Sequence, residues 1–280
     1  MKFRSALPDL AILQLEQIIP HEHVDDRRVA RLMESIEKEG VLKNPPVVLS
    51  PSAAIRKYVV LDGASRTAVF RSLGFEHILV QVVDPVPESI RVEAWNHVVL
   101  GSTVEDLFAE LEQDPLIQFA PAKGRDRQSV WVEGNPVIFL VTQDQRTYRA
   151  TSKVGGYESQ MEFLHRFVNA YHQAGDVERT VTRHPAQLLR LYKNFGYLVL
   201  LPRFKLNDVL NFAQSSLLIP AGLTRFVIIP RALRVNYPLS RLMKDQPIKE
   251  KRDELSKWLQ EKTSQRGIRF YAESIFLYDE

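Results

Sequence analysis

Five consecutive residues between an apolar run and a helical segment carry groups suited to phosphate chemistry. They are Asp62, Gly63, Ala64, Ser65 and Arg66. A helix start offers free backbone N–H groups and a positive dipole end to an anion, and Gly63 permits close backbone approach. Ser65 can donate to a phosphate oxygen, Arg66 can fork onto one, and Asp62 can hold Mg²⁺ or orient a nucleophile. The same residue types also make an ordinary helix cap, so both interpretations stand.

A second polar group, Pro20-His21-Glu22-His23, lies just before the first helical pattern. A glutamate between two histidines can serve as a general base or a metal ligand. The alternative is a polar surface loop, and two histidines two positions apart are weak evidence for zinc. A third group, Trp95-Asn96-His97, offers an aromatic face beside an imidazole. Packing of Trp95 in a core is the alternative there.

The fourth group places arginines within an apolar segment, residues 221–239. Thr224 and Arg225 stand at a loop-to-strand junction, and Arg231 and Arg234 follow closely. Because arginine is costly to bury without a partner, these residues indicate an anion. That anion is either an internal acid or the carboxylate or phosphate of a ligand.

The elements that must position these groups follow from hydrophobic periodicity and turn residues. In the first 95 residues the pattern predicts strand–helix–strand–strand–helix–strand. Residues 25–40 form the clearest amphipathic helix, with an aspartate at the start and Gly40 at the end. Beyond residue 100 we expect a hairpin, a long helix over 157–174, further strands, a late charged helix and a final strand near the C-terminus. We therefore predict an α+β protein with two lobes, residues 1–97 and 98–280.

Composition bounds the function classes. The 280 residues are 45% hydrophobic and 25% charged, as in globular proteins. The formal charge of +3 permits nucleic-acid binding without demanding it. No cysteine is present, which excludes disulfides, thiolate zinc sites and a cysteine nucleophile, and fits a cytoplasmic protein. We expect neither a signal peptide nor a membrane-spanning segment.

The first 95 residues resemble the ParB/sulfiredoxin fold. The resemblance rests on a helix ending in glycine, a proline-led strand, the strand–turn–helix with Gly63 and Arg66, and the segment "LGFEHILVQVVD". Sulfiredoxins carry a cysteine in this turn, so their sulfinic-acid chemistry is excluded here.

The chain is more closely similar to the free L-serine kinases of this fold. Four segments carry that resemblance in order along the chain: "IIPHE", "LDGASR", "AWNHV" and "GLTRFVIIPRALRVNYPL". Some members have histidines where this chain has Ala64 and Ser65. The resemblance implies phosphorylation of free L-serine to O-phospho-L-serine, with ATP or ADP as donor and Mg²⁺ as cofactor. In some members it also implies a link to siderophore biosynthesis or a regulatory role.

The resemblance further implies roles for individual residues. Glu22 would be the catalytic base, the turn from Asp62 to Arg66 would bind the donor's phosphates, and His97 would lie near the transferred group or orient a neighbour. The remaining candidates would bind serine: Trp95, Thr224, Arg225, Arg231 and Arg234. The rival hypothesis is a ParB-like, nucleotide-binding protein that binds DNA. Its best helix-turn-helix candidate, residues 205–226, contains Pro220 and Gly222 and lacks a basic recognition face.

Overall fold

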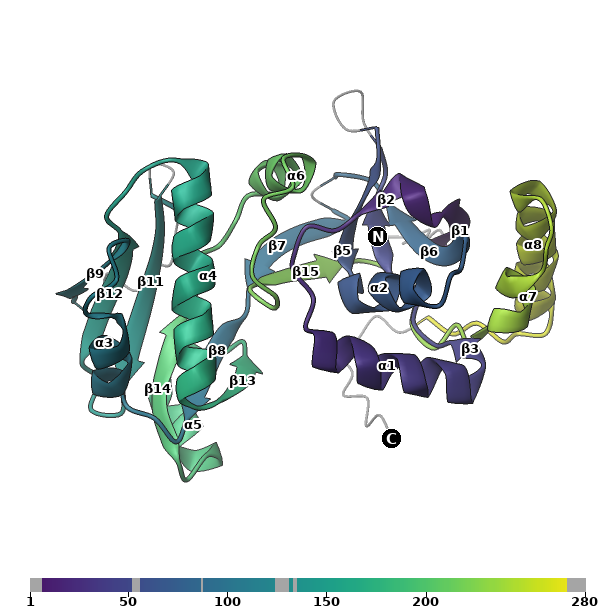
Figure 1. The fold of residues 1–280 in the computed structure, drawn as a ribbon. Helices are drawn as coiled ribbons and strands as arrows, with labels where there is room; N and C mark the ends of the chain where they lie inside the picture. Colours follow the sequence, from purple (N-terminus) through teal and green to yellow (C-terminus); the bar gives the residue numbers. More distant parts are fainter. Residues whose placement is uncertain (1–6, 52–55, 87, 124–130, 133–134, 271–280) are drawn as a thin grey trace.

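The computed structural model describes residues 7–51, 56–86, 88–123, 131–132 and 135–270, and within them the chain forms two lobes (Figure 1). The first lobe carries β1, β2, β4, β5 and β6 with helices α1 and α2, and the second is built around the long helix α4. The ribbon of β7 and β15 lies between the lobes.

The sheet of the first lobe brings two parallel strand ends to one edge. Its order is β1-β6-β4-β5-β2, and β2 runs parallel to β5, with Ile19 opposite Val59. Since parallel strands end on the same side, the residues after β2 and after β5 meet there. The elements of this part are β1 (Asp9–Gln14), η1 (Leu15–Gln17), β2 (Ile18–Ile19), α1 (Asp26–Glu39), β3 (Val41–Leu42), β4 (Val47–Leu49), β5 (Tyr58–Asp62), α2 (Ala64–Ser72) and β6 (His77–Val83).

Helix α1 forms where the pattern predicts it, with the predicted ends. The Asp25 side chain accepts hydrogen bonds from the backbone N–H groups of Arg27 and Arg28, which caps the helix. Gly40 ends it in the left-handed conformation, at φ 65°. The helix therefore fixes the approach of the segment that carries Glu22.

The second lobe packs helices against a larger sheet of order β13-β8-β14-β11-β12-β9, to which β10 adds beside β11. Its core gathers the buried side chains of α4, such as Phe163 and Phe167, with those of β8, β11 and β14. The elements are β8 (Asn96–Leu100), α3 (Val104–Leu111), β9 (Ile117–Pro121), β10 (Trp131–Val132), β11 (Asn135–Thr142), β12 (Thr147–Ser152), α4 (Tyr157–Ala174), β13 (Asp176–Thr180), α5 (Pro185–Leu191), β14 (Phe195–Leu200) and α6 (Leu206–Gln214).

Two strands join the lobes. β7 (Ile90–Ala94) leaves the first lobe and pairs antiparallel with β15 (Thr224–Ile228), which returns from the second. Beside this ribbon, two further hydrogen bonds cross the boundary between the lobes, which we call the seam. The His23 N–H donates to the Ile219 carbonyl, and the Ile219 N–H donates to the His21 carbonyl. The segment bearing Glu22 is thus hydrogen-bonded to the second half of the chain.

After β15 the chain returns to the first lobe. β16 (Tyr237–Pro238) pairs with β3, and α7 (Leu239–Met243) and α8 (Ile248–Ser264) follow. Tyr237, Leu242 and Leu255 are buried in the same core as the first-lobe strands. The division at residues 97 and 98 stays a prediction, and in space the first lobe also contains this late segment.

The predicted α+β class is confirmed, and the helices and the hairpin of β11 and β12 form where the sequence predicts them. The segment after β15 differs: the strand expected through Pro238 stops at Ile228 and continues as a loop held against the first lobe. The final predicted strand lies mostly outside the described residues.

Candidate active site

The turn between β5 and α2 has the geometry of an anion cradle. Gly63 adopts φ 93°, and no side chain caps the helix that starts after it. A Cβ on Gly63 would lie 3.0 Å from Cα and Cβ of Pro46, so this backbone is closely packed on one side. The first N–H groups of α2 therefore need a partner other than a cap, and an anion supplies one. Ala64 is buried, whereas Ser65 is half-buried at the turn.

Asp62 is held ionised by two arginines. Its Oδ2 accepts from Nη2 of Arg66 at 3.0 Å and from Nη2 of Arg231. Burial acts to raise the pKa of the Asp62 carboxyl, but the two guanidinium groups outweigh it and lower the pKa to about 2. Among the described residues, Oδ1 of Asp62 has no hydrogen-bond partner.

Arg66 is anchored from the side of the first lobe. Besides Asp62, its Nη1 donates to the backbone carbonyls of Asn44 and Pro45. Burial lowers the pKa of Arg66, which the charge of Asp62 partly offsets. The guanidinium is thereby fixed beside the start of α2.

Arg231 reaches the same carboxylate from a loop that Gln81 holds on both sides. The buried Gln81 donates from Nε2 to the Pro230 carbonyl at 2.8 Å and accepts at Oε1 from the Ala232 N–H at 2.9 Å. Arg234, three residues later, is exposed, and its N–H donates to Asn44 Oδ1 at 2.8 Å. The internal partner that the sequence left open for Arg231 is therefore Asp62.

Glu22 lies at the seam between the lobes. Its Oε2 accepts a hydrogen bond from the Gly222 N–H at 3.0 Å, and its side chain is 20% exposed. This bond joins residues 200 positions apart in the chain. The carboxylate is thus both oriented and reachable, which a general base requires.

His21 connects the two strand ends. Nδ1 donates to the Val60 carbonyl at 2.5 Å, and Nε2 accepts from the Thr224 hydroxyl at 2.8 Å. Burial lowers the pKa of His21, although the nearby charges of Glu22 and Asp62 act to raise it. The neutral ring therefore ties the Glu22 segment to β5, two residues before Asp62, and occupies the hydroxyl of Thr224.

His97 is buried and hydrogen-bonded on both ring nitrogens, and either of the roles expected for it stays a prediction. Nε2 donates to the Gly222 carbonyl at 3.1 Å, and Nδ1 accepts from the Tyr171 hydroxyl at 2.7 Å. Burial lowers the pKa of His97 to about 3, so the ring is neutral. Since the N–H of Gly222 holds Glu22, His97 supports the carboxylate through one residue.

Trp95 and Arg225 pack on each other beside the ribbon. The Arg225 guanidinium lies 5.3 Å from the centre of a Trp95 ring, and Nη1 donates to Glu93 Oε2 on the paired strand. The internal ion pair that the sequence allowed is present here. A role for Trp95, Thr224, Arg225 or Arg234 in binding serine stays a prediction.

Sequence reasoning missed the residues that make these connections. His21 was seen only as part of a polar loop, and Gln81 and Tyr171 were not singled out. Gln81 and Tyr171 stand in regular elements whose periodicity marks them as inward-facing, which is the one signal that could have found them. Nothing local indicates their partners.

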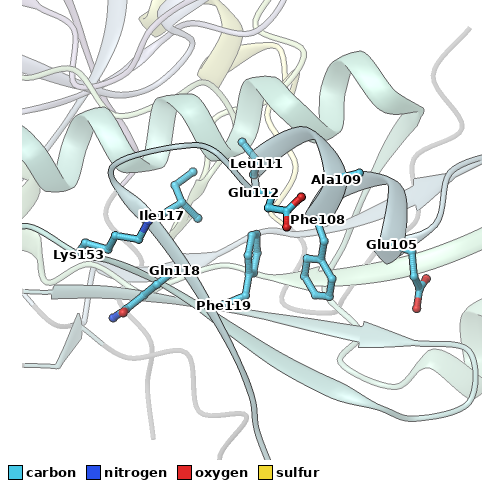
Figure 2. A pocket seen from close by; sticks show the side chains of 9 residues that line it. All are labelled: Glu105, Phe108, Ala109, Leu111, Glu112, Ile117, Gln118, Phe119 and Lys153. Carbon is cyan, nitrogen blue, oxygen red and sulfur yellow. The ribbon is translucent and has the colours of Figure 1, made fainter.

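Another hollow lies away from this site, between α3 and β9 in the second lobe (Figure 2). Its volume is about 580 Å³, and Phe108, Ile117 and Phe119 line it. Glu105 and Lys153 stand at its edge. Glu105 pairs with Arg146 at 3.3 Å, but both side chains are more than half exposed, unlike the carboxylate and arginines at Asp62.

Metal and membrane features were sought in the described part of the chain. No group of three or more metal-ligating side chains gathers there. None of the described helices combines the length and apolarity needed to cross a bilayer.

Comparison with known proteins places this site in context. Residues 5–95 match the family model of the ParB N-terminal domain. Over 82% of this chain and 90% of the relative, the sequence is 23% identical to an ATP-dependent L-serine kinase of Staphylothermus marinus. It is 24% identical to the ATP-dependent L-serine kinase SbnI of Staphylococcus aureus, over 97% of both chains.

Over most of its length the chain is thus similar to proteins named as L-serine kinases. This confirms the resemblance predicted from the sequence, and with the matching domain it confirms the fold class.

Solved structures show how far the shared fold extends along this chain. A C-terminally truncated SbnI from Staphylococcus aureus superposes with a TM-score of 0.67 at 21% identity, covering 92% of this chain and 97% of that one. A free serine kinase in complex with ADP, a glutamate-to-alanine mutant, gives 0.67 at 16% identity, covering 84% and 94%. Both lobes therefore belong to the shared fold.

Proposed function

We propose that the protein phosphorylates free L-serine to O-phospho-L-serine. The observation that carries the proposal is the meeting of Glu22 and the Asp62–Arg66 turn at the ends of parallel strands β2 and β5, joined by His21. A base and an anion cradle at one edge are what transfer of a phosphoryl group to a hydroxyl needs. The names of the relatives supply the acceptor.

Glu22 is the general base in this proposal. The serine Oγ attacks the terminal phosphorus of the donor, and the bond from that phosphorus to the bridging oxygen breaks. The hydroxyl proton passes to Glu22, and the nucleotide leaves with one phosphate fewer. General-base assistance of this kind is typically worth about 10²–10⁴ in rate.

The first-lobe turn holds the donor. Backbone N–H groups from Gly63 to Arg66 contact phosphate oxygens, and the guanidinium groups of Arg66 and Arg231 offset the charge that develops on them. Both cations are already fixed by Asp62, which supports a site that needs little rearrangement on binding. Such preorganisation is the main protein contribution to phosphoryl transfer.

Mg²⁺ is expected as the donor's counter-ion. A magnesium site usually takes one or two carboxylates, with phosphates and waters completing the shell. Asp62 fits that demand, because it is ionised and its Oδ1 is not engaged by the described residues. When bound, the ion would neutralise charge on the phosphate oxygens.

The donor in this proposal is ATP, because both curated relatives are named ATP-dependent. ADP remains the alternative. The downstream use of phosphoserine, including any siderophore precursor, and the cytoplasmic location stay predictions.

The rival DNA-binding function has less support. Between α6 and β15 the described residues form turns and no second helix, so the helix-turn-helix expected for it is lacking in this segment.

Mass spectrometry tests the function directly. The protein is incubated with Mg²⁺, ATP or ADP, and each free amino acid in turn, and phosphorylated products are sought. We expect phosphoserine with ATP, and product from no other amino acid at a comparable rate. The absence of phosphoserine with either donor would overturn the proposal.

A further inference from the structure

One arginine at the seam has not been assigned a role. Arg179 stands on β13, opposite His97 of β8. Its guanidinium lies directly against Gly222: a Cβ placed on Gly222 would be 2.0 Å from Nη2 of Arg179. Since the Gly222 N–H bonds Glu22 at 3.0 Å, Arg179 lies immediately beside the proposed base.

Arg179 has no partner for its charge within the described residues. No hydrogen bond or ion pair to its guanidinium is present there, whereas Arg66, Arg225 and Arg231 each hold a carboxylate. The pKa of Arg179 is lowered by burial and then by the nearby charge of Arg28. Arg28 belongs to the first turn of α1.

A guanidinium packed against backbone without an ion-pair partner is unfavourable unless an anion binds it. Glu22 and Asp25 act in the opposite sense on Arg179, but neither lies within ion-pair distance among the described contacts. The side chain remains exposed to solvent. An arginine that is open to solvent, packed against Gly222 and without an ion-pair partner is suited to a carboxylate ligand. The planar guanidinium can bind both carboxylate oxygens through two parallel hydrogen bonds.

We propose that Arg179 binds the carboxylate of the acceptor amino acid. This rests on the proposed serine kinase function. The resemblance implied a part in serine binding for Arg225, but its guanidinium is engaged by Glu93 and Trp95.

The position of Arg179 favours the acceptor over the donor. The donor's phosphates belong to the start of α2, where Arg66 and Arg231 are fixed. Arg179 approaches Glu22 from the second lobe, next to the Gly222 loop. A serine held there by its carboxylate would present its hydroxyl to Glu22, because only two carbon atoms separate the carboxyl carbon from the hydroxyl oxygen.

The test compares L-serine with L-serinamide, which has a neutral amide in place of the carboxylate. Arg179→Ala and Arg179→Lys are assayed beside the wild type. The control is Arg149→Ala, an exposed strand arginine on β12. We expect Arg179→Ala to lower kcat/KM for L-serine about 10- to 100-fold, as the loss of a charge-assisted pair implies. Arg179→Lys should recover only part of this, and Arg149→Ala should match the wild type.

Serinamide separates the outcomes. If Arg179 binds the carboxylate, wild type and Arg179→Ala differ little with serinamide, and KM for the nucleotide is unchanged. Equal losses with both acceptors, or a raised nucleotide KM, would overturn the proposal. Unchanged melting temperatures of the variants exclude a folding defect, and Arg179→Lys serves if the alanine variant does not fold.

Calorimetry keeps this inference separate from the kinase function. Binding of L-serine and L-serinamide is measured without turnover, in wild type and Arg179→Lys. Serine binding that weakens in the variant while serinamide binding does not supports the carboxylate site even if no phosphoserine forms. Equal serine binding in both proteins, or none in the wild type, counts against it.

Discussion

The two halves of the proposed site are built in different ways. In the turn at Asp62, one contact is local, between Asp62 and Arg66, while the contacts of Arg66 with Asn44 and Pro45 span 22 and 21 positions and that of Asp62 with Arg231 spans 169. In the seam at Glu22, every contact is long: Glu22 with Gly222, His21 with Thr224, and His97 with Tyr171. The nucleotide cradle thus has a local centre that distant residues of the same lobe complete, whereas the acceptor side depends on the joining of the two lobes.

The largest effect is expected for a substitution of Glu22, which lies at the centre of the seam. Glu22→Gln keeps an acceptor for the Gly222 N–H but removes the base, so kcat should fall about 10²–10⁴-fold while nucleotide affinity stays the same. Glu16→Gln, an exposed change in the same lobe, is the control. Rates and nucleotide binding are measured in parallel. Near-wild-type turnover in Glu22→Gln would remove the base from the mechanism.

Acid titration tests whether the seam is held by neutral histidine. His97 has a pKa of about 3 when folded against about 6.5 unfolded, so the unfolded chain binds more protons between these values. The contribution of His97 is complete above pH 6.5 and is lost as pH falls toward 3, by roughly 3–5 kcal/mol.

The variant His97→Phe isolates the contribution of His97 to the pH dependence of stability. It should be less stable near pH 7, because Tyr171 and Gly222 lose a partner, and its free energy of unfolding should fall less steeply from pH 6.5 to 4. Exposed His184→Phe is the control. Denaturant unfolding at several pH values measures both, and identical slopes for wild type and His97→Phe would contradict the assignment.

A pair of glycines tests the turn. Gly63→Ala and Gly74→Ala both place a side chain at positive φ, 93° and 72°, but only the first meets Pro46, at 3.0 Å. We expect Gly63→Ala to cost about 1–3 kcal/mol and weaken nucleotide binding, and Gly74→Ala to cost less and leave binding intact. Thermal unfolding and nucleotide titration distinguish them. Equal nucleotide affinity in both variants would show that the turn is not the cradle.

The smallest effect is expected at Arg225. Because its guanidinium is held by Glu93 and Trp95, Arg225→Ala should change KM for serine less than about threefold, well below the change at Arg179. Steady-state kinetics at saturating donor measures both. A larger effect of substituting Arg225 than of substituting Arg179 would assign the serine carboxylate to Arg225 on β15.

The sequence predicted the turn well because its information is local. Gly63 between a strand and a helix, with Arg66 one turn on, requires only neighbouring residues to be understood. Glu22 was found through resemblance to a family, since a glutamate in a polar loop has no distinguishing pattern of its own. Arg179 could not be found: on a short strand it is one of several polar residues. Its position beside the proposed base follows only from the pairing of β13 with β8 and from its contact with Gly222, 43 positions further along the chain.

The return of the chain to the first lobe bears on how the protein folds during synthesis. Tyr237, Leu242 and Leu255 complete the core that begins at Ile12, so that core lacks essential pieces until the last tenth of the chain leaves the ribosome. The second lobe runs without interruption from β8 to α6 and can fold earlier. On the ribosome the second lobe would therefore form first, and both the nucleotide cradle and the seam at Glu22 would be completed last.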